Sequence, residues 1–309
     1  MMAYLIITLL IVLAGLVIGS ITDFKKREVP DWLSYGMIFA GIGLSGLFSA
    51  VYWDYWFFLN SLIGFLVFLI IALVMFYTGQ WGGGDSKVLM GMGALIGLDI
   101  RFLKMHFLIS NGVYEITQMG NIPNFLIAFF INMLFAGAVY GLIWSVFLIF
   151  KNRKGFYKEF KKVRGRVEYV RIRNYLLVSL AVIIVLFLFN ISNLFISSVL
   201  LFFVFLFALF YMYICVKAVE KKCMIKPVTP DKLTEGDWIV KDIKYKGKYI
   251  CGPKDLGIEK KQIKELLKLY RQNKIKNVLV KEGIPFVPSF LIAYIVTLVW
   301  GNLIGLLFV

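Results

Sequence analysis

The chain has 309 residues, of which 60% are hydrophobic and 17% are charged, and its formal net charge is +16. That apolar share is well above the share in an ordinary soluble domain, and several apolar runs reach the roughly 20 residues that a helix needs to cross a bilayer. The composition therefore excludes an ordinary soluble enzyme and predicts a polytopic helical membrane protein.

Eight apolar segments follow one another along the chain. The first lacks the basic start and the small-residue cleavage site of a signal peptide, so we expect it to be retained. The apolar run over 175–216 is too long for one helix, and a turn is predicted at Asn190–Asn193. The predicted spans are residues 3–22, 32–52, 57–78, 87–99, 124–150, 175–190, 194–216 and 286–308.

The basic residues separate between the two sets of segments that connect these spans. One set holds 32 of the 34 Lys and Arg residues, and the other holds only Arg101 and Lys104. Basic loops stay on the cytoplasmic side of a membrane. We therefore expect a multi-pass cell-membrane protein with both termini extracytoplasmic. The net charge then reflects topology, and no nucleic-acid partner is expected.

Two cytoplasmic segments are long. Residues 151–174 are predicted to be a basic loop whose interleaved aromatic residues are typical of contact with anionic membrane lipids. Residues 217–285 alternate apolar and polar residues around Lys246-Gly247, which predicts a β-hairpin. Helical spacing follows over 257–273, and K-N-V-L-V-K is predicted to be a last strand.

The predicted fold class is thus an all-α polytopic membrane protein with about eight transmembrane helices and a small α+β cytoplasmic domain inserted before the last helix. The predicted domains are a transmembrane core over 1–216, the α+β domain over 217–285 and the final helix over 286–309. The three cysteines are widely spaced and His106, in an outside loop, is the only histidine. We therefore expect no disulfide framework, no metal site and no cofactor.

Two aspartates are predicted to reach the same membrane face. Asp23 ends the first span and Asp85 precedes the fourth. Ionisable groups at such a depth are costly and commonly functional. Two adjacent carboxyls cannot easily both ionise, so one keeps a proton while the other acts as a base. Such a pair can activate a water for attack on a peptide carbonyl and protonate the leaving nitrogen.

Each acid also has a structural interpretation. Asp23 could pair with the basic residues 25–27, and Asp85 could cap a helix after a glycine turn. Asp31, after Pro30, is most simply the cap of the second helix, and Glu28 is most simply solvated. The sequence contexts of Asp23 and Asp85, taken together, weigh against these readings.

Three motifs resemble one family. G-G-G-D-S-K-V-L, residues 82–89, matches the G-x-G-D motif of the type IV prepilin peptidases, including the lysine two places after the aspartate. D-F-K-K-R-E-V-P-D, residues 23–31, resembles the family's first aspartate motif, and I-P-F-V-P-S-F-L, residues 284–291, resembles the Pro-rich start of the final helix in archaeal members. The likeness covers most of the chain, but no specific motif is recognised within 99–280.

The resemblance implies an aspartic endopeptidase of the GxGD class. Asp23 and Asp85 would be its catalytic pair, and the supporting motif positions would be Gly82, Gly84, Lys87 and Pro30. Its partners would be class III signal-peptide-bearing precursors, pilin-like or archaellin, whose short basic leader is removed at the cytoplasmic face. The archaeal preflagellin and prepilin branch fits best. Bacterial members usually carry a cysteine-rich zinc loop and also methylate the product; this chain lacks those cysteines, so neither property is carried over.

Two further expectations concern substrate binding. The glycines 82–84 are expected to let a substrate backbone approach closely and to make the loop deformable. Glu28 or Asp31, or Asp237 in the soluble domain, is expected to attract the basic leader through a modest exposed contact.

Other functions stay open on the sequence alone. An ion-coupled transporter also uses glycine-broken helices with buried carboxylates, although no duplicated halves are evident and the acids lie at the membrane edge. A relative of presenilin or signal peptide peptidase would have Tyr before the first aspartate, where this chain has Thr22. A non-catalytic scaffold would leave the acid pair unexplained.

Overall fold

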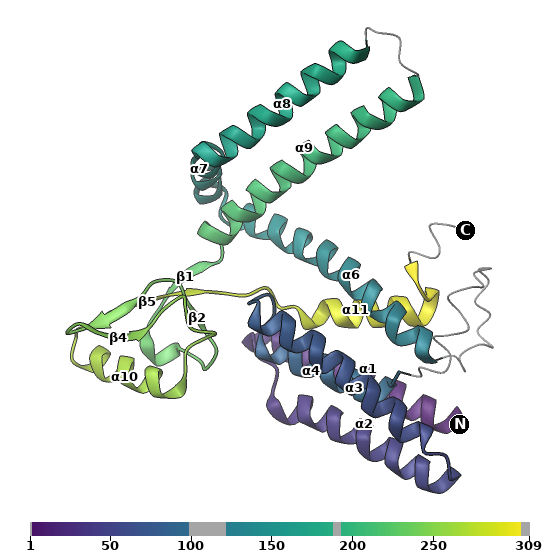
Figure 1. The fold of residues 1–309 in the computed structure, drawn as a ribbon. Helices are drawn as coiled ribbons and strands as arrows, with labels where there is room; N and C mark the ends of the chain where they lie inside the picture. Colours follow the sequence, from purple (N-terminus) through teal and green to yellow (C-terminus); the bar gives the residue numbers. More distant parts are fainter. Residues whose placement is uncertain (1, 99–121, 188–192, 304–309) are drawn as a thin grey trace. The chain divides into compact units, whose positions relative to one another are not determined.

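The computed structural model describes residues 2–98, 122–187 and 193–303 (Figure 1). Two compact units make up the chain. The first comprises residues 1–142 and 283–309, and the second comprises residues 143–282. The predicted division into residues 1–216, 217–285 and 286–309 stays a prediction. The predicted turn at 190–192 and the positions of Arg101, Lys104 and His106 lie outside the described residues.

The first unit is a helical bundle. It contains α1 (Met2–Lys26), α2 (Asp31–Tyr52), α3 (Trp56–Tyr77), α4 (Gly83–Ile96), the first part of α6 (Ile122–Lys151) and α11 (Val287–Trp300). Helix α4 packs against α1, α2 and α3, and α11 packs against α1. Four large apolar side chains of α4 are completely buried in the core of this unit: Val88, Leu89, Met92 and Leu95.

Small residues let α4 approach its neighbours at backbone contact. A Cβ added to Gly64 of α3 would lie 2.4 Å from the carbonyl oxygen of Gly93, and one added to Gly41 of α2 would lie 2.5 Å from the carbonyl carbon of Ala94. The hydroxyl of Ser61 also donates to the carbonyl oxygen of Ala94, at 2.6 Å. Such close crossings are typical of helices packed in a membrane.

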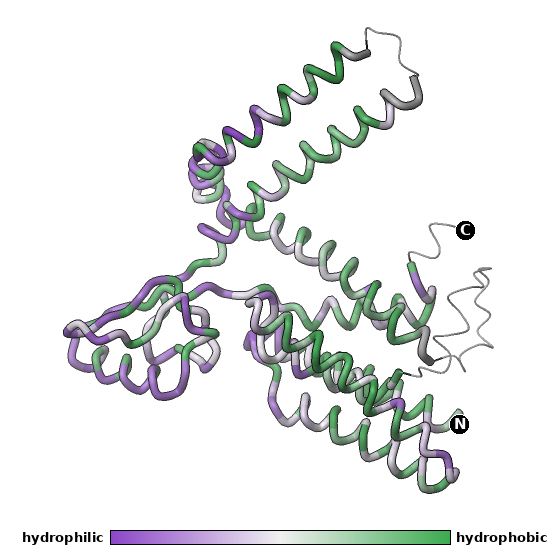
Figure 2. Tube along the Cα trace, viewed as in Figure 1, coloured by the Kyte–Doolittle hydropathy of each residue, from purple (hydrophilic) through white to green (hydrophobic). Residues whose placement is uncertain are grey.

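The helices match the predicted spans in order. Among the described residues, five are long and apolar enough to cross a membrane: α1, α2, α3, α6 and α9 (Asn193–Lys222). These helices are mostly hydrophobic along their length in Figure 2. Helix α11 is apolar but shorter, and neither α4 nor α8 (Val167–Phe187) is among the five. The chain is therefore a multi-pass membrane protein, and eight crossings stay a prediction.

The second unit continues α6 into two further helices before α9. They are α7 (Arg153–Arg164) and α8 (Val167–Phe187), so the basic segment predicted as a loop is helical. Helix α7 carries its cations on one side and buries Phe156 and Val163 on the other, where Phe156 packs with Ala218 and Val219 of α9. That amphipathic spacing is the physical reason for the helix.

The rest of the second unit is a small α+β domain. Strand β5 (Val278–Lys281) pairs in antiparallel fashion with both β1 (Ile225–Val228) and β2 (Trp238–Ile239). The predicted hairpin is confirmed as β3 (Ile243–Tyr245) and β4 (Lys248–Cys251), whose turn places Lys246 and Gly247 at φ 50° and 81°. The predicted helix and last strand are confirmed as α10 (Lys260–Arg271) and β5; β1 and the short η2 (Pro230–Lys232) are additional.

Candidate active site

Asp23 lies in the last turn of α1 and points into the protein. Its side chain is buried although it is a carboxylate, with a relative exposure of 6%. One carboxylate oxygen, Oδ2, accepts a hydrogen bond from the backbone N–H of Val287 at 3.1 Å. Val287 is the first residue of α11, so the carboxyl group is held by the start of a helix that follows 264 positions later.

Asp85 lies in the first turn of α4, because this helix begins at Gly83, four residues before the predicted span. Its Oδ2 accepts a hydrogen bond from the backbone N–H of Gly82 at 3.2 Å. Burial, and after it the charge of Asp23, raise the pKa of Asp85 to about 7, although the Gly82 hydrogen bond opposes this shift. Near neutral pH this carboxyl therefore exchanges readily between its acid and carboxylate forms.

The two aspartates are thus neighbours, since α1 packs against α4 and the charge of Asp23 acts on Asp85. Arg27 and Tyr140 also interact electrostatically with Asp23. Arg27 follows Asp23 by one helical turn and donates from Nη1 to the carbonyl oxygen of Gly283 at 3.1 Å. Tyr140 on α6 was not singled out by the sequence, because no motif surrounds it.

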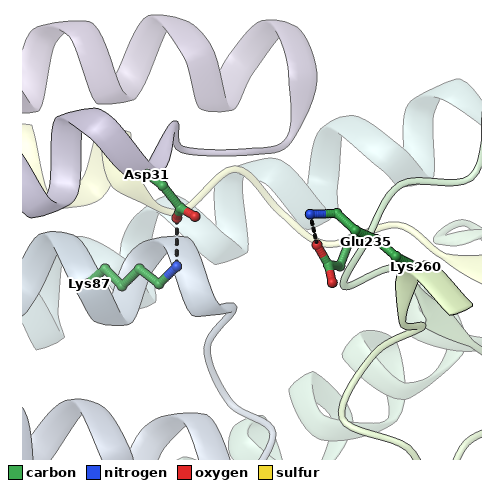
Figure 3. A network of polar contacts seen from close by, with 4 residues as sticks. All are labelled: Asp31, Lys87, Glu235 and Lys260. Atoms are coloured by element: carbon green, nitrogen blue, oxygen red, sulfur yellow. Dashed lines mark hydrogen bonds and ion pairs between the residues drawn. The ribbon is translucent and has the colours of Figure 1, made fainter.

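The two acidic motifs are joined by an ion pair. Lys87 Nζ lies 2.6 Å from Oδ1 of Asp31 (Figure 3). It also lies 5.1 Å from the ring centre of Tyr35. The motif lysine therefore holds α4 to the start of α2. Asp31 is the first residue of α2 and Pro30 is its N-cap, with φ −60°.

Gly84 of the glycine loop packs against Val29 of the first aspartate motif. A Cβ on Gly84 would lie 3.1 Å from Cβ and 3.2 Å from Cγ2 of Val29, so this glycine fits closely against the link between α1 and α2. A Cβ on Gly83 would meet only a ring carbon of Phe76, at 3.8 Å, and one on Gly82 would lie 3.4 Å from Oδ2 of Asp85. Packing explains Gly84, whereas the approach of a substrate to Gly82 and Gly83 stays a prediction.

An aromatic cluster ties α11 to the glycine loop. Trp81 is 6% exposed, and its ring centre lies 5.8 Å from that of Phe286 and 5.6 Å from that of Phe290. The ring of Phe286 also covers Gly137 of α6, where an added Cβ would approach it to 2.6 Å. The start of α11 thus contacts Asp23 and also Trp81, the residue directly before the G-x-G-D motif. The Pro-rich sequence signalled this segment, but not its contacts.

Two further acidic candidates are Glu28 and Asp237. Glu28 is exposed. Asp237 belongs to the second unit, where its Oδ2 accepts the backbone N–H of Thr234 at 2.8 Å and its carbonyl oxygen accepts that of Ile258 at 2.9 Å. No group of three or more His, Cys, Asp or Glu side chains that could hold a metal ion occurs within the described part of the chain.

Comparison with known proteins finds similarity in the first half of the chain. The model of the Type IV leader peptidase family matches residues 10–142. "Preflagellin peptidase" of Methanococcus voltae is 34% identical over 140 residues, which are 45% of this chain and 55% of that protein. "Preflagellin peptidase" of Methanococcus maripaludis is 32% identical over 136 residues, which are 44% and 53%.

A more distant relative is "Prepilin peptidase EppA" of Methanothermobacter thermautotrophicus, 23% identical over 155 residues, or 50% of this chain and 39% of that protein. No solved structure matches the chain significantly. The chain spans about half the length of the two preflagellin peptidases that it matches. The match to the model of the Type IV leader peptidase family covers less than half of the chain, and it includes Asp23 and Asp85.

Proposed function

We propose that this protein is a membrane-embedded aspartic endopeptidase that removes the short basic leader of pilin-like or archaellin precursors at the cytoplasmic face of the membrane. One observation carries the proposal. Asp23 and Asp85, 62 positions apart, lie at the ends of α1 and α4, where the charge of Asp23 acts on Asp85, and the pKa of Asp85 is raised to about 7. A pair with one proton held near neutral pH is what general acid–base hydrolysis requires.

The proposed reaction adds one water across one peptide bond. The carboxylate of the pair takes a proton from water while the water oxygen bonds to the carbonyl carbon, which becomes tetrahedral. The protonated carboxyl of the pair then gives its proton to the amide nitrogen, and the carbon–nitrogen bond breaks. The leader leaves with a new carboxyl end and the mature protein with a new amino end. The two aspartates finish with their protons exchanged, and a proton transfer between them restores the starting state.

The substrate class follows from the relatives and from the charges near the site. Two relatives are named for preflagellin processing and one for prepilin processing. We propose that Glu28 or Asp31 attracts the basic leader of such a precursor. Asp31 is already paired with Lys87, so a leader cation must displace Lys87 to reach it. Glu28 is exposed, so we expect a leader cation to reach it without displacing Lys87. Exposed contacts of this kind contribute at most about 1 kcal/mol.

The proposal is tested with the purified protein in detergent or liposomes. A preflagellin-type and a prepilin-type precursor are incubated with it, and the released leader and the mature product are weighed by mass spectrometry. The expected result is a single cut between the basic leader and the hydrophobic helix of at least one precursor. Intact precursors of both kinds, with a correctly folded protein, would overturn the proposal and favour an ion-coupled transporter instead.

A further inference from the structure

The start of α11 provides the feature that makes the two aspartates unequal. We propose that the backbone N–H of Val287 holds Asp23 as the ionised base of the pair, so that Asp85 is the partner that carries the proton. This inference rests on the proposed function, because it assigns the two chemical roles within that site. It makes Val287 a positioning residue that acts through its backbone rather than its side chain.

The contact has the geometry of a stabilised carboxylate. Oδ2 of Asp23 lies 3.1 Å from the Val287 nitrogen, and both residues are buried. Helix α11 has 14 residues and Val287 is the first. The first N–H groups of a helix have no carbonyl partner within the helix, and they form its positive end. A hydrogen bond donated to the charged form of a carboxyl, at such an end, favours that charged form.

The charges around the pair favour the same assignment. Asp23 interacts with the cation of Arg27, the residue directly after α1, and with Tyr140 of α6 and Asp85 of α4. Asp85 has the anion of Asp23 as its charged neighbour and accepts one hydrogen bond from the backbone N–H of Gly82. The repulsion between the two carboxylates is mutual, so the cation of Arg27, which acts on Asp23, separates their ionisation in the direction proposed.

The donor is fixed in place from both sides. Further along α11, the hydroxyl of Tyr294 donates to the carbonyl oxygen of Leu9 on α1 at 2.8 Å. The hydroxyl of Ser289 donates to the carbonyl oxygen of Phe286 at 2.7 Å. In front of it, Phe286 packs on Trp81, directly before the glycine loop. Because α11 is anchored to α1 and to this loop, its first N–H group is presented to Asp23 without further ordering.

A consequence is that the site is completed from outside the segment that matches the family. That match covers residues 10–142, whereas the donor follows at 287, after the whole second unit over 143–282. The final helix is then part of the catalytic arrangement and not only an additional membrane anchor.

The contact itself is tested by NMR on protein in which Val287 is retained, and a Val287 variant serves only to assign the signal. The protein is labelled with ¹⁵N-valine, the Val287 amide signal is assigned with Val287→Ala, and its chemical shift is followed against pH. We expect the signal to move as Asp23 ionises, with a midpoint below that of Asp85, and to lose this step in Asp23→Asn. A Val287 signal that ignores pH, or one unchanged by Asp23→Asn, would overturn the inference, and neither result depends on whether any precursor is cleaved.

The role is tested by replacing Val287 with its α-hydroxy acid, which keeps the side chain but exchanges the N–H for an ester oxygen. The matched control is the same exchange at Ala293, which lies in the interior of α11. We expect the acid limb of the kcat profile to move upward by about one pH unit for position 287, with a smaller change in KM, and not to move for position 293.

An unchanged acid limb at position 287, or an equal shift at both positions, would contradict the assigned role. Failure of the proposed function looks different. In that case the Val287 signal would still follow Asp23, while the unmodified protein would leave every precursor intact.

Discussion

Lys87 Nζ lies 2.6 Å from Asp31 Oδ1, and this ion pair joins the helix that carries Asp85 to the helix that follows Asp23. The side chains are 31% and 68% exposed, so water screens the pair and its contribution to stability is modest. In a double-mutant cycle with Lys87→Met and Asp31→Asn we expect a coupling energy of about 0.2–1 kcal/mol, measured by unfolding in detergent. A coupling of several kcal/mol would show that the pair is far less solvated than the structure indicates.

Binding of the basic leader is expected to depend on Glu28 and, less strongly, on Asp31. Glu28→Gln is expected to raise KM by up to about fivefold, the equivalent of about 1 kcal/mol, and this effect should shrink as salt is added. Asp31→Asn alone should change KM less, because Lys87 already occupies Asp31. Steady-state kinetics with a leader whose lysines are replaced by glutamine is the control. An equal effect of Glu28→Gln on both leaders would show that Glu28 does not interact with the lysines of the leader.

Variants of the glycine loop distinguish effects on packing from effects on the approach of a substrate. Gly84→Ala places a methyl group 3.1 Å from Cβ of Val29, and we expect it to lower the free energy of unfolding by about 1–3 kcal/mol. Gly83→Ala meets nothing closer than 3.8 Å, so it should leave stability unchanged. Thermal unfolding of both variants distinguishes them. Gly83→Val that keeps its Tm but loses cleavage would support close substrate approach, whereas full cleavage by Val variants at 82, 83 and 84 would contradict it.

The crossing of α3 and α4 should tolerate no added methyl group. In Gly64→Ala the new Cβ would lie 2.4 Å from the Gly93 carbonyl oxygen, whereas Gly43 has nothing within 4 Å of the same position. We expect Gly64→Ala to lose about 3 kcal/mol through forced separation of the helices, while Gly43→Ala changes little. Equal Tm values for the two variants would contradict the close crossing that positions α4.

The pKa of Asp85 predicts a dependence of stability on pH. This pKa is raised from 3.8 to about 7, so folding favours the protonated form. The resulting stabilisation is fully present below about pH 4 and is lost as pH rises through about 7, by about 4 kcal/mol at most. Asp85→Asn should remove this slope and be more stable than the parent at pH 8. Asp242→Asn, at an exposed position of the second unit, should keep the slope; its disappearance there too would exclude Asp85 as the cause.

Much of this architecture could be predicted from the sequence because local patterns determine it. Apolar runs marked each long helix, and the alternation around Lys246-Gly247 marked the β3–β4 hairpin. Strand β1 was missed because it has only four residues, I-K-P-V, with a proline inside. Helix α7 was read as a loop because its charge masked its amphipathic spacing.

Only part of the candidate site could be predicted from the sequence. Asp23 and Asp85 stand in motifs, so the sequence could name them as candidates. The Val287 N–H group carries no side-chain signal and is 264 positions from Asp23. The pairing of Lys87 with Asp31 depends on how α4 packs against α2, although both residues were already marked as motif positions. Contacts of this kind come from tertiary packing, which no local pattern records.

The orientation of the chain can be measured by labelling. In a background with Cys215, Cys223 and Cys251 replaced by Ala, single cysteines at Lys158 and Lys254, both exposed, should be shielded from an impermeant reagent in intact cells. A cysteine at Ser110 should react. The expected pattern follows from the bias of basic residues. Labelling at position 158 from outside would reverse the orientation and place the aspartates at the other face.

The most direct test of the central claim is the cleavage rate of a preflagellin-type precursor by Asp23→Asn, Asp85→Asn and the double variant, each confirmed as folded and inserted. Two carboxyls that share one reaction act as a unit, so each single change should lower kcat/KM by roughly 10⁴-fold or more, and the double change should be no worse than either one. Near-normal cleavage by either inserted single variant would contradict the aspartate-pair account.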